Sequence, residues 1–409
     1  MPTAFLVLSA GGALAVLNAT RPIRWTPLLL PSFFAAWLTA ELAPQLLVLL
    51  ALGVLLFTVL GGAPGATGLA VLALCAVQLF GLLRMVQSSE RAADVADLAL
   101  AGMSDTAAGP GPDIGIKKGP EVASGFRRFF VPLSFRHPEV ERLVDVAYSE
   151  LSPRHRLDVY RHRSHPTGCP TLLQVHGGGW VIGDKREQGR PLMLRLASRG
   201  WVCFAPNYRL SPKATFPDHL VDVKRALAWV REHGAEYGAD PGFLVITGGS
   251  AGGHLAALAA LTQNDPEYQP GFEDADTSVS GCVPYYGVYD IVGETGTKAA
   301  RLRSRRLLER LVFKTRDREA FVKASPIERV RADAPPFLVI HGRNDTLVPV
   351  QEARLFVERL RARSDEPVVY IELPGTQHAF DVFPSIRSAH VVRAVERFVE
   401  LLRRRHEAD

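Results

Sequence analysis

The feature that most constrains this fold is the scarcity of charge in residues 1–86. The charged side chains there are Arg21, Arg24, Glu41 and Arg84, although 22% of the whole chain is charged. Four apolar stretches follow one another, each a little shorter than the roughly 20 residues that a membrane-spanning helix needs. The stretches cover residues 4–19, 27–40, 46–60 and 66–83. The alternative is a buried helical bundle in a soluble protein, but so long an apolar region exceeds what such a core buries. We therefore expect a transmembrane region of three or four helices.

The placement of arginine predicts how this region is oriented. Arg21 and Arg24 follow the first stretch, and Arg84 and Arg91 follow the last. Positively charged residues favour the cytoplasmic side, so an even number of spans separates two pairs that both lie there. That gives three spans and a cytoplasmic C-terminal domain, whereas four spans would place the domain on the opposite side. A cleaved signal peptide is disfavoured because no basic residue precedes the first stretch.

Beyond residue 86 the composition changes. Residues 87–125 are more polar and contain the turn-forming run Gly109–Pro112, which predicts a linker. Over residues 126–409, short apolar strands alternate with helical patterns. The expected strands cover residues 140–148, 156–160, 171–175, 202–206, 243–247, 281–286, 337–340 and 368–373, and the expected helices cover residues 218–233, 251–263 and 388–405. This alternation predicts an α/β fold with a mostly parallel sheet and helices on both faces.

A glycine-rich pentapeptide follows the expected strand at residues 243–247. Residues 248–252 read Gly-Gly-Ser-Ala-Gly and fit the pattern G-x-S-x-G, with Ser250 at the centre. Between a strand and a helix, this pattern makes a sharp turn that lifts the serine hydroxyl above the sheet. The start of the next helix also directs N–H groups and partial positive charge toward that hydroxyl. Ser250 is therefore the expected nucleophile, and the alternative is a serine that only caps a helix.

A second glycine run, His-Gly-Gly-Gly-Trp at residues 176–180, follows another expected strand. Acyl transfer passes through a tetrahedral oxyanion, which needs N–H donors already in place. Glycine lets the backbone approach that oxygen because it has no Cβ. We assign the donors to the N–H groups of Gly178, Gly179 and Ala251, and a shift of the first pair to include Gly177 stays open. The alternatives are an ordinary turn and a phosphate-binding loop, although the latter lacks its Lys-Ser/Thr pair.

A serine hydroxyl becomes a good nucleophile when an imidazole takes its proton. His378 follows the expected strand at residues 368–373, and Asp345 follows the one at residues 337–340. The chain order Ser, Asp, His, with each residue just past a late strand, is that of α/β-hydrolases. Asp345 would hold the imidazole tautomer and stabilise the imidazolium ion. Asp381 is a rival acid, but it follows His378 by about one helical turn, so we expect it to pair locally.

From about residue 156 to the C-terminus, these motifs together resemble the α/β-hydrolase esterases of the hormone-sensitive-lipase-like group. The resemblance is carried by His176-Gly-Gly-Gly-Trp180, Asn207-Tyr-Arg-Leu-Ser-Pro212, Gly248-Gly-Ser-Ala-Gly-Gly253, Asp345 and His378. It implies the α/β-hydrolase fold and hydrolysis of carboxylic esters without a cofactor or metal, with Trp180 binding the substrate. The group usually has Asp where this chain has Gly249. Prenylcysteine methylesterases and kynurenine formamidases are similar too, and the fold alone does not choose among these substrates.

An insertion at about residues 288–334 lies where hydrolases of this fold often carry a lid. Within it, residues 297–314 combine several arginines with leucines, as does a basic amphipathic helix near anionic lipid. The alternative is a solvated helix whose leucines pack on the core.

Together these features predict a membrane-anchored serine esterase or lipase-like hydrolase, with a hydrophobic ester and membrane lipid as its partners. The alternatives are an amide or formamide hydrolase with the same triad, and a membrane binding protein on an inactive hydrolase fold. A net charge of +5 is not by itself a nucleic-acid signature, so we expect no such partner. Four cysteines without paired spacing predict neither a disulfide scaffold nor a zinc site. The oligomeric state is not predicted.

Overall fold

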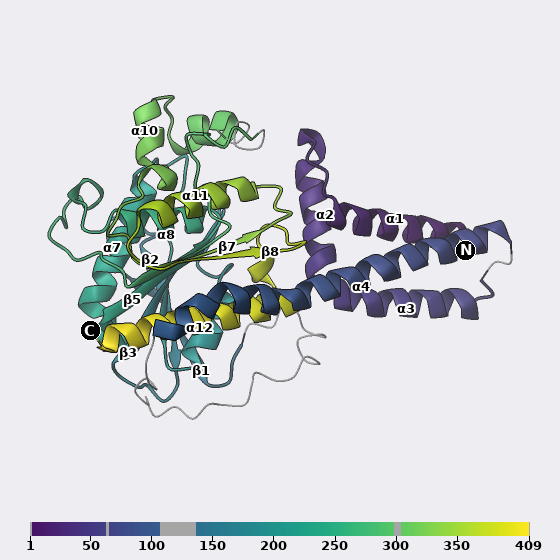
Figure 1. Cartoon of the computed structure of the whole chain (residues 1–409), viewed down its shortest axis with the longest axis horizontal. Helices are drawn as coiled ribbons and strands as arrows, with labels where there is room; N and C mark the ends of the chain where they lie inside the picture. The colour runs from purple at the N-terminus through teal and green to yellow at the C-terminus, as the bar shows by residue number, and fades with distance from the viewer. Residues whose placement is uncertain (1, 63–64, 107–135, 298–303, 409) are drawn as a thin grey trace.

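The computed structural model describes residues 2–62, 65–106, 136–297 and 304–408. The chain forms two parts, a bundle of long helices and an α/β domain, which Figure 1 shows side by side. The helices of the first part come from the N-terminal apolar region. One of them, α4, continues across the α/β domain and joins the two parts.

An eight-stranded sheet forms the centre of the α/β domain, with the strand order β1-β2-β4-β3-β5-β6-β7-β8. The pairs β1–β2 and β2–β4 are antiparallel, and every other pair is parallel. The strands are β1 (Val140–Ala147), β2 (Arg156–His162), β3 (Cys169–Val175), β4 (Val202–Pro206), β5 (Ala239–Gly249), β6 (Gly281–Tyr285), β7 (Phe337–Gly342) and β8 (Val368–Leu373). The inner strands β3, β4, β6 and β7 are buried along their whole length, as parallel strands covered on both faces are.

Helices cover both faces of this sheet, which confirms the predicted architecture. One face packs against α7 (Asp218–His233), α8 (Ala251–Leu261) and α11 (Val350–Arg363). The other packs against α6 (Arg190–Ala197) and α12 (Ile386–Ala408). The shorter helices are η3 (Gly234–Tyr237), η4 (Pro266–Tyr268), α10 (Arg318–Lys323), η6 (Pro326–Glu328) and η7 (Phe380–Val382). All the strands and helices expected from the sequence are present, and the α-helices α6, α10 and α11 are additional.

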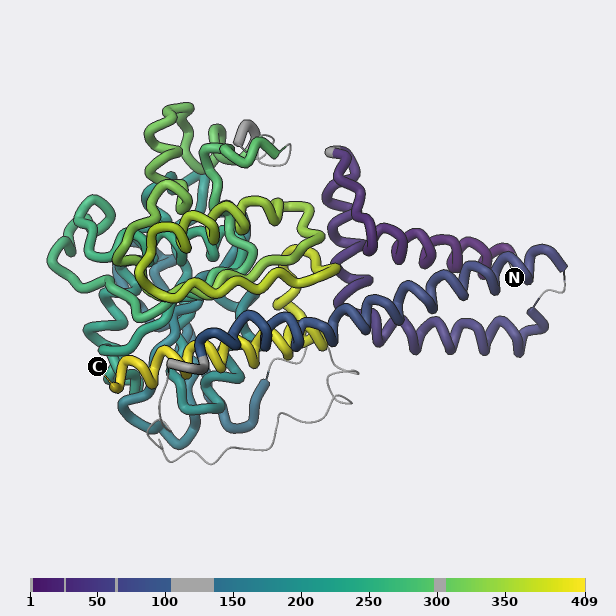
Figure 2. The backbone as a smooth tube through the Cα atoms, in the orientation of Figure 1, coloured from purple at the N-terminus to yellow at the C-terminus, as the bar shows by residue number. Residues whose placement is uncertain are grey.

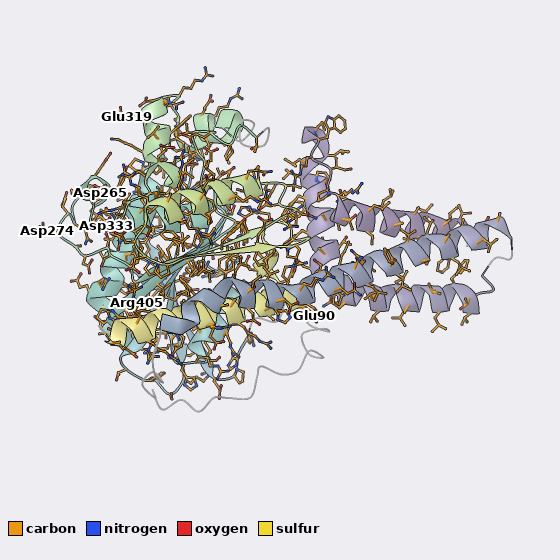
Figure 3. All side chains as sticks on the ribbon, viewed as in Figure 1. Glu90, Asp265, Asp274, Glu319, Asp333 and Arg405 are labelled. Carbon is orange, nitrogen blue, oxygen red and sulfur yellow. The ribbon has the colours of Figure 1, made fainter. Side chains whose placement is uncertain are left out.

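Four helices precede the domain, one for each apolar stretch. They are α1 (Pro2–Thr20), α2 (Leu29–Glu41), α3 (Ala43–Val59) and α4 (Ala66–Leu100), with short turns η1 (Thr26–Leu28) and η2 (Ala101–Thr106). Two of them, α1 and α4, are long and apolar enough to cross a membrane, and the α2–α3 pair, bent by 84°, would make a third crossing if it counts as one. Figure 2 shows α1, α3 and α4 extending away from the domain, while α2 lies across their near ends. In Figure 3 the side chains on α1 and α3 are almost wholly carbon.

The helix α4 is longer than its apolar stretch. Residues 87–100, which we expected to begin a linker, continue the helix without a break. The physical reason lies in one face of this segment, where Ala92, Ala96 and Leu100 are buried in the same core cluster as α6 and α12. The four-residue spacing places these side chains on one face. The predicted turn at residues 109–112 lies outside the described residues.

The insertion at residues 288–334 packs on the α/β domain. Its described part contains the π-helix η5 (Ser304–Val312) and α10. Leu308 and Val312 belong to the main core cluster, so the apolar side of this segment faces the protein interior. That agrees with the solvated-helix alternative for residues 304–312, and residues 298–303 lie outside the described part of the chain.

Candidate active site

Ser250 lies between the last residue of β5 and the first residue of α8, in the kind of turn predicted for a nucleophile. Its backbone angles are φ 59° and ψ −120°, which residues other than glycine rarely adopt. The turn leaves no room for a Cβ at the glycines two residues before and after the serine. A Cβ at Gly248 would lie 2.5 Å from the Gly252 carbonyl oxygen, and one at Gly252 would lie 2.2 Å from the Val175 oxygen. Close packing around the turn therefore holds Ser250 at the carboxyl end of β5.

Asp345 and His378 come together at the same end of the sheet. The loop after β7 carries Asp345 and the loop after β8 carries His378, and Asp345 Oδ2 lies 2.6 Å from His378 Nδ1. Both side chains are buried. Because the carboxylate can only accept, Nδ1 carries the proton of a neutral imidazole, and Nε2 is left as the basic nitrogen.

The environment of Asp345 keeps it ionised. Burial alone would raise the pKa of this carboxyl, but the electrostatic attraction and hydrogen bonds of His378 and His341 outweigh burial and hold the pKa well below its usual range. Its other oxygen accepts hydrogen bonds of 2.8 Å from the backbone N–H groups of Leu347 and Val348. Asp345 is thus a fixed anion with oriented oxygens.

Tyr286 connects Ser250 with this pair. The backbone N–H of Ser250 donates to the Tyr285 carbonyl oxygen at 3.0 Å, and the next residue, Tyr286, has its ring centroid 4.4 Å from that of His378. Among the described residues, the Ser250 hydroxyl makes no hydrogen bond to His378. Catalytic hydrogen bonds are often long in a site without substrate and tighten when it binds. Ser250 and the Asp345–His378 pair therefore lie at the same end of the sheet, and the Asp345–His378 hydrogen bond is the contact that is formed.

Asp381, the rival acid, bonds to Tyr286 instead of His378. The Tyr286 hydroxyl donates a short hydrogen bond to Asp381 Oδ1, so the partner of Asp381 lies 95 residues away along the chain and is not the local one that we expected. Burial raises the pKa of Asp381, and the Tyr286 hydrogen bond opposes that shift only in part. Tyr286 also explains why position 249 is a glycine, since a Cβ there would lie 2.7 Å from the Tyr286 hydroxyl oxygen. Our sequence reasoning missed Tyr286, whose only signal is its place at the end of the expected strand 281–286.

The predicted oxyanion loop presents free N–H groups beside this centre. Gly177 N–H donates to Gln188 Oε1 at 2.7 Å and is occupied, whereas the N–H groups of Gly178 and Gly179 have no acceptor within the described part of the chain. Gly178 has φ 111°, and a Cβ there would lie 2.0 Å from the Ile182 oxygen, so only glycine fits. Ala251 is the first residue of α8, where helical N–H groups lack intrahelical acceptors.

His176 braces this loop, as we expected. Its ring stacks on Tyr208 with centroids 4.3 Å apart, and its Nδ1 lies 2.7 Å from the Gly177 carbonyl oxygen. The Tyr208 hydroxyl donates to the His176 carbonyl oxygen at 3.0 Å. Burial lowers the pKa of His176 to about 4, so the imidazole is neutral near pH 7. It is a structural residue, not a base.

Trp180, predicted to bind substrate, lies in the protein interior. Only 2% of it is exposed, and its ring meets His254 edge-on at a centroid distance of 5.0 Å. His254 and His341 bond through Nε2 to the carbonyl oxygens of Ala324 and Val348, consistent with packing roles. Contact between Trp180 and substrate stays a prediction. Within the described ranges, no three His, Cys, Asp or Glu side chains are grouped so as to hold a metal ion.

Comparison with known proteins finds esterases among the relatives of this chain. Residues 157–360 match the BD-FAE family. The probable carboxylic ester hydrolase LipM of Mycobacterium tuberculosis is 54% identical over 260 residues, which cover 62% of this chain and 60% of LipM. The esterase LipC of the same organism is 45% identical over 66% of this chain and 68% of LipC. This chain thus spans about three fifths of LipM and two thirds of LipC.

Solved structures point to the same fold. Esterase B of Lactobacillus rhamnosis has a TM-score of 0.58 at 23% identity, covering 66% of this chain and 90% of that chain. Est2, a thermophilic esterase of Thermogutta terrifontis solved with butyrate bound, has a TM-score of 0.53 at 27% identity, covering 64% of this chain and 94% of that one. The fold is therefore that of the α/β-hydrolases, and the chain belongs to the hormone-sensitive-lipase-like esterases, with LipC as a relative and a BD-FAE domain at residues 157–360.

Proposed function

We propose that this protein is a membrane-anchored serine hydrolase of carboxylic esters. The observation that carries the proposal is the 2.6 Å contact between Asp345 and His378, at the end of the sheet where the turn holding Ser250 also lies. A buried, ionised carboxylate that fixes the proton on Nδ1 leaves Nε2 free to act as a base. The named esterases among the relatives support the same reaction class.

In the proposed reaction, Ser250 Oγ attacks the acyl carbonyl while His378 Nε2 takes the hydroxyl proton. Asp345 stabilises the resulting imidazolium, and the N–H groups of Gly178, Gly179 and Ala251 stabilise the oxyanion. The carbon–oxygen bond to the alcohol then breaks, and His378 returns the proton to the leaving alkoxide. Water, activated by the same imidazole, hydrolyses the acyl-enzyme and restores the free serine.

The proposed anchor consists of α1, α3 and the first half of α4. Support comes from the apolar length of α1 and α4 and from the packing of α1 and α3 on α4. Three crossings put Arg21, Arg24 and the α/β domain on one side of the membrane, and the positive charge favours the cytoplasm. With its domain held at the surface, the enzyme would meet esters that reside in or near the bilayer.

The proposed substrate is accordingly a hydrophobic ester. Plant relatives named isoprenylcysteine α-carbonyl methylesterase support this choice, the one from Arabidopsis thaliana being 30% identical over 220 residues. Nothing in the site favours the amide bond over the ester. Paired ester and amide substrates of one acyl group should therefore show hydrolysis of the ester at least about tenfold faster, because an alkoxide leaves more readily than an amide nitrogen.

The test is covalent labelling of the purified full-length protein with a fluorophosphonate probe, which reacts with activated serines. The wild type should become labelled at residue 250, and Ser250→Ala should lose labelling and at least about 10³-fold of its esterase rate. Ser149→Ala, which changes a serine in a surface loop, is the matched control and should behave as the wild type. Labelling that survives Ser250→Ala would overturn the assignment of the nucleophile.

A further inference from the structure

The helix α2 of the N-terminal region lies directly against the loop that carries His378. The Phe33 ring meets the His378 imidazole edge-on, with centroids 6.4 Å apart and planes at 70°. Trp37 stacks on Phe33 at 5.8 Å and contacts Phe383 at 4.8 Å. An apolar helix from the start of the chain thus touches the proposed base itself. Figure 1 shows α2 standing between the domain and the ends of α1 and α3.

A hydrogen bond fixes α2 to the residue after the base. Trp37 Nε1 donates to the Ala379 carbonyl oxygen at 2.9 Å. Ala379 has φ 56°, a left-handed conformation that disfavours residues with a Cβ. Such a conformation persists only when its surroundings hold it. The indole N–H is therefore one of the contacts that hold the backbone beside His378.

A buried ion pair fixes the far end of the same segment. Glu41, the last residue of α2, forms a short ion pair with Arg387 and accepts a 2.6 Å hydrogen bond from the Ser385 hydroxyl. Glu41 and Arg387 are both almost fully buried. A pair so deeply buried is costly to break, because removing one partner leaves an uncompensated charge.

Two further contacts come from the helices α4 and α1. The Ser88 hydroxyl on α4 donates to the Pro374 carbonyl oxygen at 2.9 Å. The Asn344 amide, next to the proposed acid Asp345, lies 3.4 Å from the Thr20 carbonyl oxygen at the end of α1. The loops after β7 and β8 therefore both rest on the N-terminal helices.

We propose that α2 is a positioning element of the active site. Phe33, Trp37 and Glu41 hold the His378 loop, defined as residues 374–387, so that the imidazole meets Asp345 and faces Ser250. This inference rests on the proposed function, because it takes His378 to be the base. The N-terminal region then does more than anchor the enzyme, since the rate of the chemical step depends on how α2 is seated. A displacement of about 1 Å in such a site can cost about a hundredfold in rate.

The test uses Trp37→Phe in the full-length protein, in lipid nanodiscs, with the water-soluble ester p-nitrophenyl acetate. Phenylalanine keeps an aromatic ring but removes the indole N–H, so Ala379 loses its donor. The expected result is a fall of about tenfold in kcat and in the rate of fluorophosphonate labelling, with KM within twofold of the wild type. A small soluble substrate is chosen because its delivery does not depend on the membrane.

Trp25→Phe is the matched control, because Trp25 lies in the same region but is 61% exposed. It should keep wild-type kcat and labelling. Phe33→Leu is the second variant, because it keeps apolar volume but removes the edge-on contact, and we expect kcat to fall about threefold. If thermal unfolding shows that Trp37→Phe folds poorly, the kcat of Phe33→Leu tests the inference in its place.

Three results would overturn the inference. The first is a wild-type kcat in Trp37→Phe, or in Phe33→Leu where Trp37→Phe does not fold. The second is an equal loss in Trp25→Phe, which would indicate a general effect of altering the anchor. The third is a wild-type protein that neither hydrolyses esters nor becomes labelled, which would overturn the proposed function as well and is recognised without any variant.

Discussion

The helical region and the α/β domain contain similar apolar side chains but place them in opposite environments. In α1, Leu8 and Leu14 are 72% and 67% exposed, whereas every residue of β3 is buried. A contiguous apolar surface of this kind marks contact with lipid or another partner. A soluble domain instead buries such side chains against a sheet. The comparison shows that a leucine by itself does not predict whether its side chain is buried or exposed. The medium around each region, lipid or water, determines which arrangement is stable.

The largest effect is expected inside the α/β domain, where two buried carboxylates lie near one imidazole. Asp345→Asn should lower kcat by about 10³–10⁴-fold, because a neutral amide cannot stabilise the imidazolium ion and its NH2 group favours the wrong tautomer of His378. Asp381→Asn should keep kcat within about threefold of the wild type, since its amide oxygen can still accept the Tyr286 hydrogen bond. Ester hydrolysis near pH 7.5 measures both. Equal losses in the two variants would mean that the acid has been assigned wrongly.

The contrast between the regions can be tested with one substitution in each. Leu14→Arg on α1 should impair membrane insertion, because an arginine at the centre of a span costs about 2.5–3.5 kcal/mol. Leu151→Arg is the matched variant, since Leu151 is 73% exposed but lies on the α/β domain, and it should leave insertion unchanged. The measurement is the fraction of protein that resists alkaline extraction from membranes. If the two variants extract alike, α1 does not lie in lipid.

A smaller effect should separate the two regions by their packing. Gly249→Ala would bring a Cβ within 2.7 Å of the Tyr286 hydroxyl oxygen, and we expect a loss of about 1–3 kcal/mol of stability. Gly11→Ala on α1 meets nothing within 4 Å and should cost none, because alanine favours helix. Thermal unfolding in detergent measures both. An undiminished melting temperature in Gly249→Ala would show that Tyr286 can move aside.

Much of the α/β domain could be predicted because its signals are local. Each expected strand is an apolar run bounded by turns, and the order of Ser250, Asp345 and His378 places each one after a strand. The helix at residues 87–100 was missed because its polar composition resembles a linker. Its buried face, with Ala92 and Ala96, becomes recognisable only when the sheet and α12 lie beside it. Helix α2 was expected as an apolar stretch, but nothing local indicates that its aromatic residues meet His378.

The sequence by itself determined the apolar N-terminal helices, the alternation of strands and helices, and the polar residues at the strand ends. Periodicity and turn chemistry act over a few residues, so they can be read along the chain. Only the tertiary structure decided that Asp381 bonds to Tyr286, that Tyr286 occupies the space beside Gly249, and that Trp37 bonds to a residue 342 positions away. Such contacts depend on the position that each loop adopts in the packed fold, and no short stretch of sequence predicts that position.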